Sequence, residues 1–294
     1  MRPDRTPPTS RDGLEDRIDE YRDRTDGRLG VFLGRPEPDG FDVVHAVRPD
    51  ERFASASVIK VPLLWTLYDR YDGRLDELTT PHGLAEPNRV GGSGVFHLLG
   101  DLDPSLEDLA RAMIAISDNA ATNELIDHLG RETITERMHE LGLRETRLGR
   151  KMMVTDDGET ALPPDATENV TSPQDVATLF ADIHREATLS AAAYDRLRVP
   201  LRNQKDVSMF ARYLPPDARL EHKTGWLATA ALDAGICYTD ENPLVYAVFL
   251  DGVGHAGDGT DIVAEVGDAV HAWLRSLGES GRRPTDRGGH VDRR

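Results

Sequence analysis

Three short motifs in the sequence carry the residue types that covalent attack on a carbonyl carbon requires. They are Ser57-x-x-Lys60, Ser117-Asp118-Asn119 and Lys223-Thr224-Gly225, in that order along the chain. Residues three apart on a helix share one face, so the amine of Lys60 can reach the hydroxyl of Ser57. A buried lysine can lose its proton and act as a base, whereas an arginine stays charged. These motifs therefore indicate a serine nucleophile that is activated by a lysine.

Lysine is otherwise rare in this chain, and that makes its place in the motifs informative. The sequence has four lysines and thirty-one arginines, and Lys60 and Lys223 are two of the four. With eleven serines in the chain, composition alone predicts roughly 0.15 cases of a serine three residues before a lysine. An exposed helical pair without a catalytic role is therefore the less favoured interpretation of Ser57 and Lys60.

The ordered set of motifs resembles that of the class A serine β-lactamases and the related penicillin-binding proteins. Ser57 and Ser117 lie sixty residues apart, close to the spacing in that family, and the residues flanking the first motif match as well. The resemblance covers roughly residues 28–277. It implies a serine hydrolase that opens the amide bond of a β-lactam, a small-molecule substrate, through an acyl-serine intermediate and without a cofactor.

This resemblance assigns a role to the residues of the first two motifs. Ser57 is expected to be the nucleophile, at a helix N-terminus where backbone amides favour developing negative charge. Lys60 is expected to act as general base or proton relay, although for this family it is disputed which group takes the proton. Ser117 would pass a proton to the leaving nitrogen, and Asn119 would orient Lys60 and the substrate. Taken alone, Ser117-Asp118-Asn119 fits an ordinary helix cap equally well.

The third motif implies a binding site for the substrate carboxylate. Lys223 and Thr224 can bind a carboxylate, and Gly225 lets the acyl group approach the backbone. The resemblance also places the oxyanion hole at the backbone N–H groups of Ser57 and Trp226. Small residues are common at the position of Trp226 in the antibiotic-degrading members of the family, so its large side chain could narrow the pocket.

The sequence departs from the class A pattern at the residue that deacylation needs. Class A enzymes carry a glutamate two residues after an arginine, and this glutamate activates the hydrolytic water. Counting without a gap from the matching segment 146–150 places Met152 at that position, and methionine cannot act as a base. Asp156, Asp157 and Glu159 follow, and one of them could supply the acid, although a solvated acidic loop is the favoured interpretation. A missing general base costs roughly 10²–10⁴-fold in rate, so we expect an acyl-enzyme that clears slowly.

Two other functions fit the same motifs. One is a penicillin-binding-protein-like peptidase or esterase with slow deacylation, which the methionine at position 152 favours. The other is a non-catalytic domain that retains the fold and senses a ligand. In that case the hydroxyl of Ser57 would be dispensable for ligand binding and for the biological effect.

The charge of the chain limits its partners. A net charge of −17 would repel nucleic acid and anionic membranes, so neither is expected as a partner. Abundant acid with little lysine is typical of adaptation to high salt, where screening weakens self-repulsion. A GC-rich genome would explain the arginines but not the excess of acid. The ten histidines show no paired metal spacing on a helix face, so no metal is expected.

The sequence shows no targeting or membrane segment. The first ten residues are charged and proline-rich without an apolar run, and no stretch approaches the length that spans a bilayer. The single cysteine, Cys237, lies in an apolar run and is expected to be a buried packing residue outside any internal disulfide. These features predict a monomeric cytoplasmic protein.

Strand-like segments at both ends of the chain enclose a helical middle. Apolar runs predict strands at 29–33, 41–46, 228–238 and 244–250. Periodicity and caps predict helices at 14–24, 57–71, 106–116, 120–129, 133–141, 173–186 and 261–277, with another starting near Ser190. Together with the resemblance, this pattern predicts an α/β (α+β) fold, in which an antiparallel sheet is flanked by helices and joined to an all-helical subdomain.

The same pattern predicts one catalytic domain over residues 11–277. Its α/β part is expected at about 11–60 and 195–277, and its helical part at about 61–194. Residues 1–10 and 278–294 are polar and rich in proline, glycine, arginine or aspartate. We expect these two end segments to be disordered.

Overall fold

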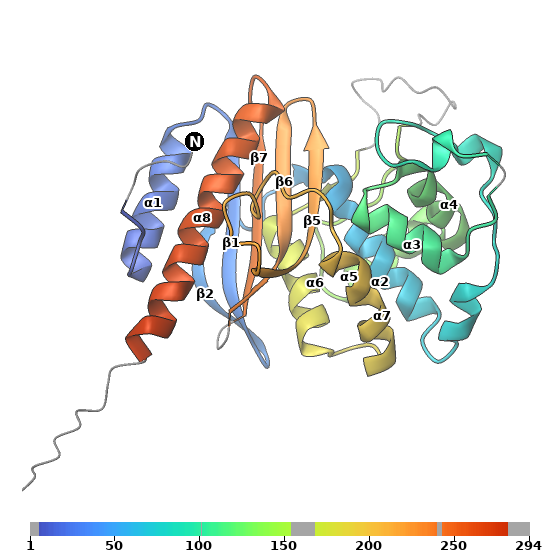
Figure 1. Ribbon diagram of the computed structural model, residues 1–294, viewed down its shortest axis with the longest axis horizontal. Coiled ribbons are helices and arrows are strands. Elements are labelled where there is room, and N and C mark those ends of the chain that lie inside the picture. The colour runs from blue at the N-terminus through green and yellow to red at the C-terminus, as the bar shows by residue number, and fades with distance from the viewer. Residues whose placement is uncertain (1–5, 101, 154–167, 240–242, 282–294) are drawn as a thin grey trace, which may run out of the picture.

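A five-stranded antiparallel sheet is built from both ends of the chain. The computed structural model describes residues 6–100, 102–153, 168–239 and 243–281 (Figure 1). The strands are β1 (Arg28–Glu37), β2 (Gly40–Val47), β5 (Arg219–Leu227), β6 (Ala230–Tyr238) and β7 (Leu244–Asp251). They follow the order β2-β1-β7-β6-β5, so β1 near the N-terminus pairs with β7 near the C-terminus. The expected fold class, an antiparallel sheet flanked by helices, is confirmed.

Helices cover both faces of the sheet, and its central strands are apolar for that reason. Every residue of β6 and β7 is buried except the last one of each strand. α8 (Ala256–Gly281), with α1 (Arg11–Asp23) beside it, lies against one face, and α6 (Pro173–Arg185) packs on the other (Figure 1). Cys237 is 1% exposed in the apolar cluster beneath α8, which confirms its expected packing role.

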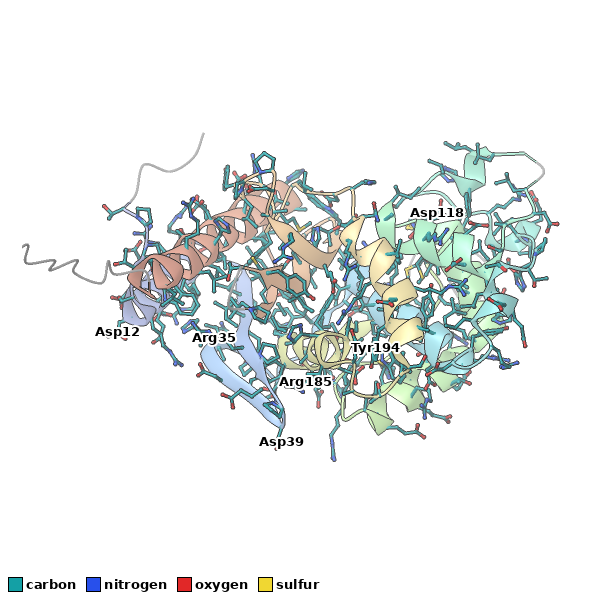
Figure 2. The ribbon with its side chains drawn as sticks, turned by 60° about the horizontal axis from the view of Figure 1, so that its bottom comes forward. Asp12, Arg35, Asp39, Asp118, Arg185 and Tyr194 are labelled. Atoms are coloured by element: carbon teal, nitrogen blue, oxygen red, sulfur yellow. The ribbon has the colours of Figure 1, made fainter. Side chains whose placement is uncertain are left out.

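The helical layer is organised around α2 (Lys60–Arg70), in which every residue from Lys60 to Tyr68 is buried. A helix that is apolar on most sides belongs in a core. Around it lie α3 (Leu106–Ala115), α4 (Asn119–Leu129), α5 (Arg131–Glu140) and α7 (Ala191–Arg202). Tyr194 of α7, labelled in Figure 2, donates its hydroxyl hydrogen to Asp182 of α6 at 2.6 Å. This hydrogen bond ties the helical layer to the helix on the sheet.

Side-chain caps fix the starts of several helices. Ser105 and Asp108 form the predicted capping box at α3, and Ser172 caps α6 with Pro173 in its first turn, as the sequence predicts. The short elements are β3 (Phe53–Ala54), β4 (Val170–Thr171), η1 (Ala56–Ile59), η2 (Leu75–Thr79), η3 (Glu86–Asn88) and η4 (Phe96–Leu98). No helix in the described ranges has the length and apolar character to cross a membrane.

The structure differs from the expected elements near the catalytic motifs. The helix expected from Ser57 starts as the 3₁₀ turn η1, and α2 begins only at Lys60. Arg219–Leu227 forms a strand, β5, that is not among the expected strands, and it pairs with β6. Lys223, Thr224 and Gly225 therefore lie within the edge strand of the sheet.

Residues near the two ends of the described chain contact each other. Ser10 caps α1 by accepting a hydrogen bond from the Gly13 amide at 3.1 Å, and Pro8 is buried. At the other end α8 continues past Leu277 to Gly281. The Ser276 hydroxyl donates to the Thr9 carbonyl at 3.4 Å, so the two ends support each other. Residues 6–10 and 278–281 of the two end segments belong to the described part of the chain, and the remaining residues of both segments lie outside it.

Candidate active site

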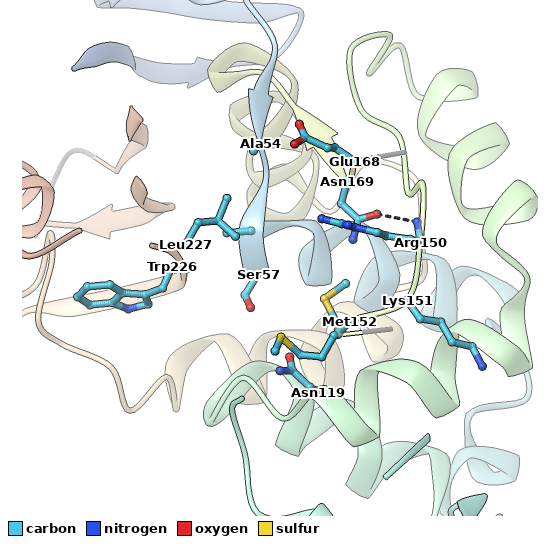
Figure 3. A pocket seen from close by; sticks show the side chains of 12 residues that line it. Ala54, Ser57, Asn119, Arg150, Lys151, Met152, Glu168, Asn169, Trp226 and Leu227 are labelled. Atoms are coloured by element: carbon cyan, nitrogen blue, oxygen red, sulfur yellow. Dashed lines mark hydrogen bonds between the residues drawn. The ribbon is translucent and has the colours of Figure 1, made fainter. Parts of the chain in front are cut away.

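Ser57 lies in the turn η1 at the junction of the sheet and the helical layer, half-buried in a cavity of about 130 Å³. The preceding residue, Ala56, has a left-handed backbone (φ 45), a strained conformation for a residue with a Cβ. Figure 3 shows the Ser57 hydroxyl facing the cavity. The lining residues are Ala54, Ala56, Ser57, Asn119, Arg150, Lys151, Met152, Met153, Glu168, Asn169, Trp226 and Leu227.

Lys60 lies one turn after Ser57 and its side chain is completely buried. Its Nζ atom donates to the carbonyl of Ser117 at 2.8 Å, to the Ser117 hydroxyl at 3.0 Å and to Oδ1 of Asn119 at 2.8 Å. Burial lowers the pKa of Lys60 well below its ordinary value, and the charge of Lys223 lowers it further, while Asp118 opposes the shift. The ammonium form can donate to all three oxygens, whereas the neutral amine has two N–H groups and keeps a lone pair that can accept a proton from a hydroxyl such as that of Ser117.

Asp118 holds the second motif in place. Its buried carboxylate accepts from the amides of Val95 (2.6 Å), Phe96 (2.9 Å) and Ala121 (2.9 Å). It therefore fastens the loop before η4 to the start of α4. Ser117 has a left-handed backbone (φ 55), and this conformation accompanies the contact of both its carbonyl and its hydroxyl with Lys60. The motif does cap α4, so the helix-cap interpretation and the catalytic one both describe it.

A glycine-rich loop packs directly on this motif. Nδ2 of Asn119 donates to the Gly91 carbonyl at 2.9 Å, and the Asn119 amide donates to the Ser93 carbonyl at 3.1 Å. Gly94 has φ 90, and a Cβ there would lie 2.2 Å from Oδ2 of Asp118. Only glycine leaves room for that carboxylate. The spacing of the motifs did not predict that this loop supports Asn119. The glycines at positions 91, 92 and 94 are the sequence feature that could have indicated it.

Gly225 brings the edge strand β5 against the nucleophile. A Cβ at Gly225 would lie 3.0 Å from the Cβ of Ala56 and 3.2 Å from the amide nitrogen of Ser57. Because β5 has a neighbouring strand on one side only, alternate N–H groups on its other side are free of the sheet. The strand thus lies close enough to Ser57 for the backbone N–H groups of Ser57 and Trp226 to donate to the same carbonyl oxygen of a substrate.

Lys223 is the second buried lysine of the site, with no exposed surface. Its Nζ donates to the Thr224 carbonyl at 2.8 Å. Burial lowers the pKa of Lys223 to about 7, although Asp206 and Asp233 oppose the shift. The neighbouring His222 faces the other side of the sheet, where its Nδ1 lies 3.1 Å from Oδ1 of Asp233.

Trp226 does not narrow the pocket in the way its size suggests. The side chain is 44% exposed, and its indole points away from Ser57 (Figure 3). The indole N–H donates to Oδ2 of Asp206 at 2.7 Å. Burial raises the pKa of Asp206, but hydrogen bonds from Ser208, Trp226 and Thr224 outweigh this and lower it overall. Asp206 is therefore an ionised anchor beside the third motif, and no motif in the sequence pointed to it.

Met152 occupies the position expected for the deacylation glutamate and is fixed there by its backbone. The Met152 amide donates to Oδ1 of Asn123 at 2.7 Å, and Nδ2 of Asn123 donates back to the Met152 carbonyl at 3.0 Å. The methionine lines the cavity and is 9% exposed. Lys151 turns away, and its Nζ donates to Oδ1 of Asn88 at 2.9 Å and pairs with Asp127 at 2.6 Å.

The acids Asp156, Asp157 and Glu159 lie outside the described residues. Among the described residues that line the cavity, Glu168 provides the carboxylate, and sequence reasoning did not single it out. Figure 3 shows this carboxylate beside Ala54 and directed away from Ser57. The next residue, Asn169, accepts from the amides of Gly149 (2.8 Å) and Arg150 (2.9 Å), so these three residues are held together beside the cavity.

The sheet, the helical layer and the serine–lysine site define the class of the protein, and comparisons with known proteins agree. A model of the beta-lactamase enzyme family (Beta-lactamase2) matches residues 13–274. The chain therefore belongs to the beta-lactamase enzyme family. This finding confirms the resemblance that the three motifs carry.

Individual relatives are similar in sequence and in structure. A beta-lactamase of Streptomyces lavendulae is 30% identical over 233 residues, which are 76% of this chain and 73% of the relative. The crystal structure of a beta-lactamase from Sphaerobacter thermophilus superposes with a TM-score of 0.80 at 28% identity, over 90% of this chain and 98% of that one. The structure of PBP-A gives a TM-score of 0.79 at 25% identity, over 92% of this chain and 100% of that one.

Proposed function

We propose that this protein is a serine hydrolase of the class A type that opens the amide bond of a β-lactam through an acyl-Ser57 intermediate. The observation that carries the proposal is the buried amine of Lys60, held by Ser117 and Asn119 one turn from Ser57. The lowered pKa of this amine raises its neutral fraction above that of an exposed lysine, and the neutral form can accept the serine proton.

Acylation then follows from the contacts of the site. Oγ of Ser57 attacks the carbonyl carbon while its proton passes to Lys60, and the amide N–H groups of Ser57 and Trp226 bind the developing oxyanion. The Ser117 hydroxyl, 3.0 Å from Nζ of Lys60, relays the proton to the ring nitrogen as the C–N bond breaks. The opened ring stays attached to Ser57 as an ester, and no leaving group is lost.

Substrate orientation falls to the edge strand. Lys223 in its ammonium form provides a donor for the carboxylate of the substrate. The hydroxyl of Thr224 donates to Asp206 in this structure and becomes a second donor for the substrate only when it turns away from Asp206. Asp206, whose pKa is lowered by its hydrogen bonds despite its burial, keeps Thr224 and Trp226 in place. The positive charge of Lys223 also favours the neutral form of Lys60. The same charge therefore serves both to bind the substrate carboxylate and to prepare Lys60 to accept the Ser57 proton.

Deacylation is the slow step in this proposal. The thioether of Met152 cannot activate a water molecule, and the carboxylate of Glu168 is directed away from Ser57 (Figure 3). Loss of a general base lowers a rate by roughly 10²–10⁴-fold. The acyl-enzyme should therefore accumulate before it is hydrolysed.

The test is a chromogenic cephalosporin mixed with the protein in comparable amounts. We expect a rapid colour burst equal to the concentration of active sites, followed by a slow steady rate. Ser57→Ala is the control and should show neither phase. Absence of a burst, or a burst that survives in Ser57→Ala, would overturn the proposal.

A second candidate is a peptidase or esterase related to the penicillin-binding proteins, favoured by the methionine at position 152 and by the structural similarity to PBP-A. It differs in its true substrate, a peptide or ester, with the β-lactam acting as an inhibitor. Steady turnover of an acyl-D-alanyl ester that exceeds turnover of any β-lactam would favour this candidate.

A domain that senses a ligand without catalysis is a third candidate. It predicts that Ser57→Ala keeps full ligand affinity and biological effect.

The setting in which the protein works is a further part of the proposal. We propose adaptation to high salt, supported by the net charge of −17 and by exposed ion pairs such as Arg74–Glu77 and Arg212–Asp261. We also propose a monomer in the cytoplasm without nucleic-acid or membrane partners. Light scattering at several salt concentrations and fractionation of the host cells test these two points.

A further inference from the structure

A second cleft lies at the start of the edge strand, away from the Ser57 cavity. It has a volume of about 590 Å³ and is formed by the end of α6, the end of α7 and the paired ends of β5 and β6. None of its lining residues lines the Ser57 cavity. They are His184, Arg198, Arg202, Ala218, Arg219, Leu220, Glu221 and Tyr238.

The cleft concentrates positive charge in a strongly acidic protein. Arg198, Arg202 and Arg219 line it, whereas Glu221 is its one acidic lining residue. Burial lowers the pKa of His184, and the nearby Arg198 lowers it further, so this ring is neutral at pH 7. The lining therefore has a net charge of about +2 on a chain whose total is −17.

Glu221 organises the arginines instead of neutralising the opening. Its side chain is 2% exposed. One oxygen accepts from Nε of Arg202 at 2.8 Å, and the other accepts from the Tyr238 hydroxyl at 3.0 Å, with Nε of Arg198 at 3.7 Å. A carboxylate covered on every side in this way holds the guanidinium groups in fixed positions and presents little negative charge to the cleft.

Donors remain free at the surface of the cleft. Arg202 uses only Nε within the described hydrogen bonds, and its side chain is 53% exposed. Arg219 is exposed and lies 5.9 Å from the ring centroid of Tyr238. It has no ion pair with any residue in the described ranges. By contrast Arg212, a short distance along the chain, is paired with Asp261.

We propose that this cleft binds a small anion that carries phosphate or carboxylate groups through the guanidinium groups of Arg202 and Arg219. The planar fork of arginine matches two oxygens of a carboxylate or phosphate group. The rings of Tyr238 and His184, with centroids 5.9 Å apart, supply an apolar wall for the rest of the ligand. A cleft of this volume is of the size that holds small-molecule ligands.

Calorimetric titration with inorganic pyrophosphate and with citrate, at constant ionic strength set with KCl, tests the proposal. We expect saturable binding of at least one of these anions with a stoichiometry of one. Binding of pyrophosphate alone assigns a phosphate ligand, and binding of citrate alone assigns a carboxylate ligand. No saturable binding of either anion would overturn the proposal.

Substitutions of single arginines test whether the anion binds in this cleft. Arg219→Gln should weaken it by at least roughly tenfold, because a charged hydrogen-bond partner is lost. Arg202→Lys keeps a charge near Glu221 but loses the fork, and should also weaken binding. Arg212→Gln is the matched control and should bind as the wild type does. An equal loss in Arg212→Gln, or no loss in Arg219→Gln with an unchanged melting temperature, would contradict the assigned site. Acylation of Ser57 should be unaffected by all three variants, so this test is independent of the proposed function.

Discussion

Nζ of Lys60 lies 2.8 Å from Oδ1 of Asn119, although 59 positions separate the two residues in the chain. Both side chains are buried, and the amide of Asn119 is itself fixed by the Gly91 carbonyl. The amine therefore has a defined position in the protein interior. This relationship between α2 and the start of α4 is the structural basis for treating Lys60 as the proton acceptor of the site.

Replacing Lys60 by arginine should abolish acylation. Arginine keeps its proton and its planar group does not fit three acceptors arranged around a single nitrogen. We expect the acylation rate to fall by roughly 10²–10⁴-fold, measured by intact-protein mass spectrometry after mixing with penicillin. The circular dichroism spectrum should stay that of a folded protein. Lys205→Arg, at an exposed lysine outside the site, is the control, and wild-type acylation in Lys60→Arg would refute the role of the amine.

The pH dependence of acylation should fall off on the alkaline side. Burial lowers the pKa of Lys223 to about 7, and only the ammonium form binds a carboxylate strongly. The second-order acylation rate constant should therefore decrease as pH rises above 7, approaching about tenfold per unit. Lys223→Arg keeps its charge at every pH in this range and should remove the decline. A rate constant that rises steadily from pH 7 to about pH 9 in the wild type would contradict this prediction.

Introducing a glutamate at position 152 should speed deacylation. The backbone of Met152 is held by Asn123, so a carboxylate there would replace the thioether that lines the cavity. We expect the decay of the acyl-enzyme to accelerate by roughly 10²–10⁴-fold, with acylation little changed. Met152→Gln has a similar size without a base and should behave as the wild type. Equal acceleration in both variants would point to a loosened loop instead of a general base.

Adding a methyl group at Gly94 should disturb the site through the loop that supports Asn119. A Cβ there would lie 2.2 Å from the Asp118 carboxylate, at a backbone φ of 90. We expect Gly94→Ala to reduce the free energy of unfolding by about 1–3 kcal/mol and to slow acylation. Gly100→Ala, where a Cβ meets nothing within 4 Å, should leave both unchanged. Urea unfolding and the rate constant of the burst measure the two effects, and matching values for the two variants would refute the argument.

Salt should stabilise the protein. With a net charge of −17, repulsion among acidic groups opposes the folded state, and screening relieves it. We expect the melting temperature to rise by about 5 °C or more when KCl increases from about 0.1 M to about 2 M. Differential scanning fluorimetry measures this change. A flat or falling curve would remove the argument for salt adaptation.

The chemistry of the site could be read from the sequence because it depends on short local spacings. Ser57 and Lys60 share a turn, and Lys223 to Gly225 share a strand, so each motif brings its own residues together. The caps at Ser105 and Ser172 are local in the same sense. These parts of the fold need no knowledge of long-range packing.

The supports of the site could not be read in this way because they join distant segments. Asp206, in the connection between α7 and β5, reaches Trp226, and Asn123 of α4 reaches Met152, which lies 29 positions along the chain. The hydrogen bond to Asp206 orients the indole of Trp226. For this reason the size of the tryptophan alone led to the wrong expectation of a narrowed pocket. Glu168 is likewise brought to the cavity by tertiary structure, and no periodicity marks it.

A mass-spectrometric time course with penicillin tests the central claim most directly, because it separates acylation from deacylation. The account predicts that the intact protein gains the mass of one penicillin molecule at Ser57 and loses it slowly, while Ser57→Ala gains nothing. No covalent mass gain on the wild type, or a gain that persists in Ser57→Ala, would contradict it.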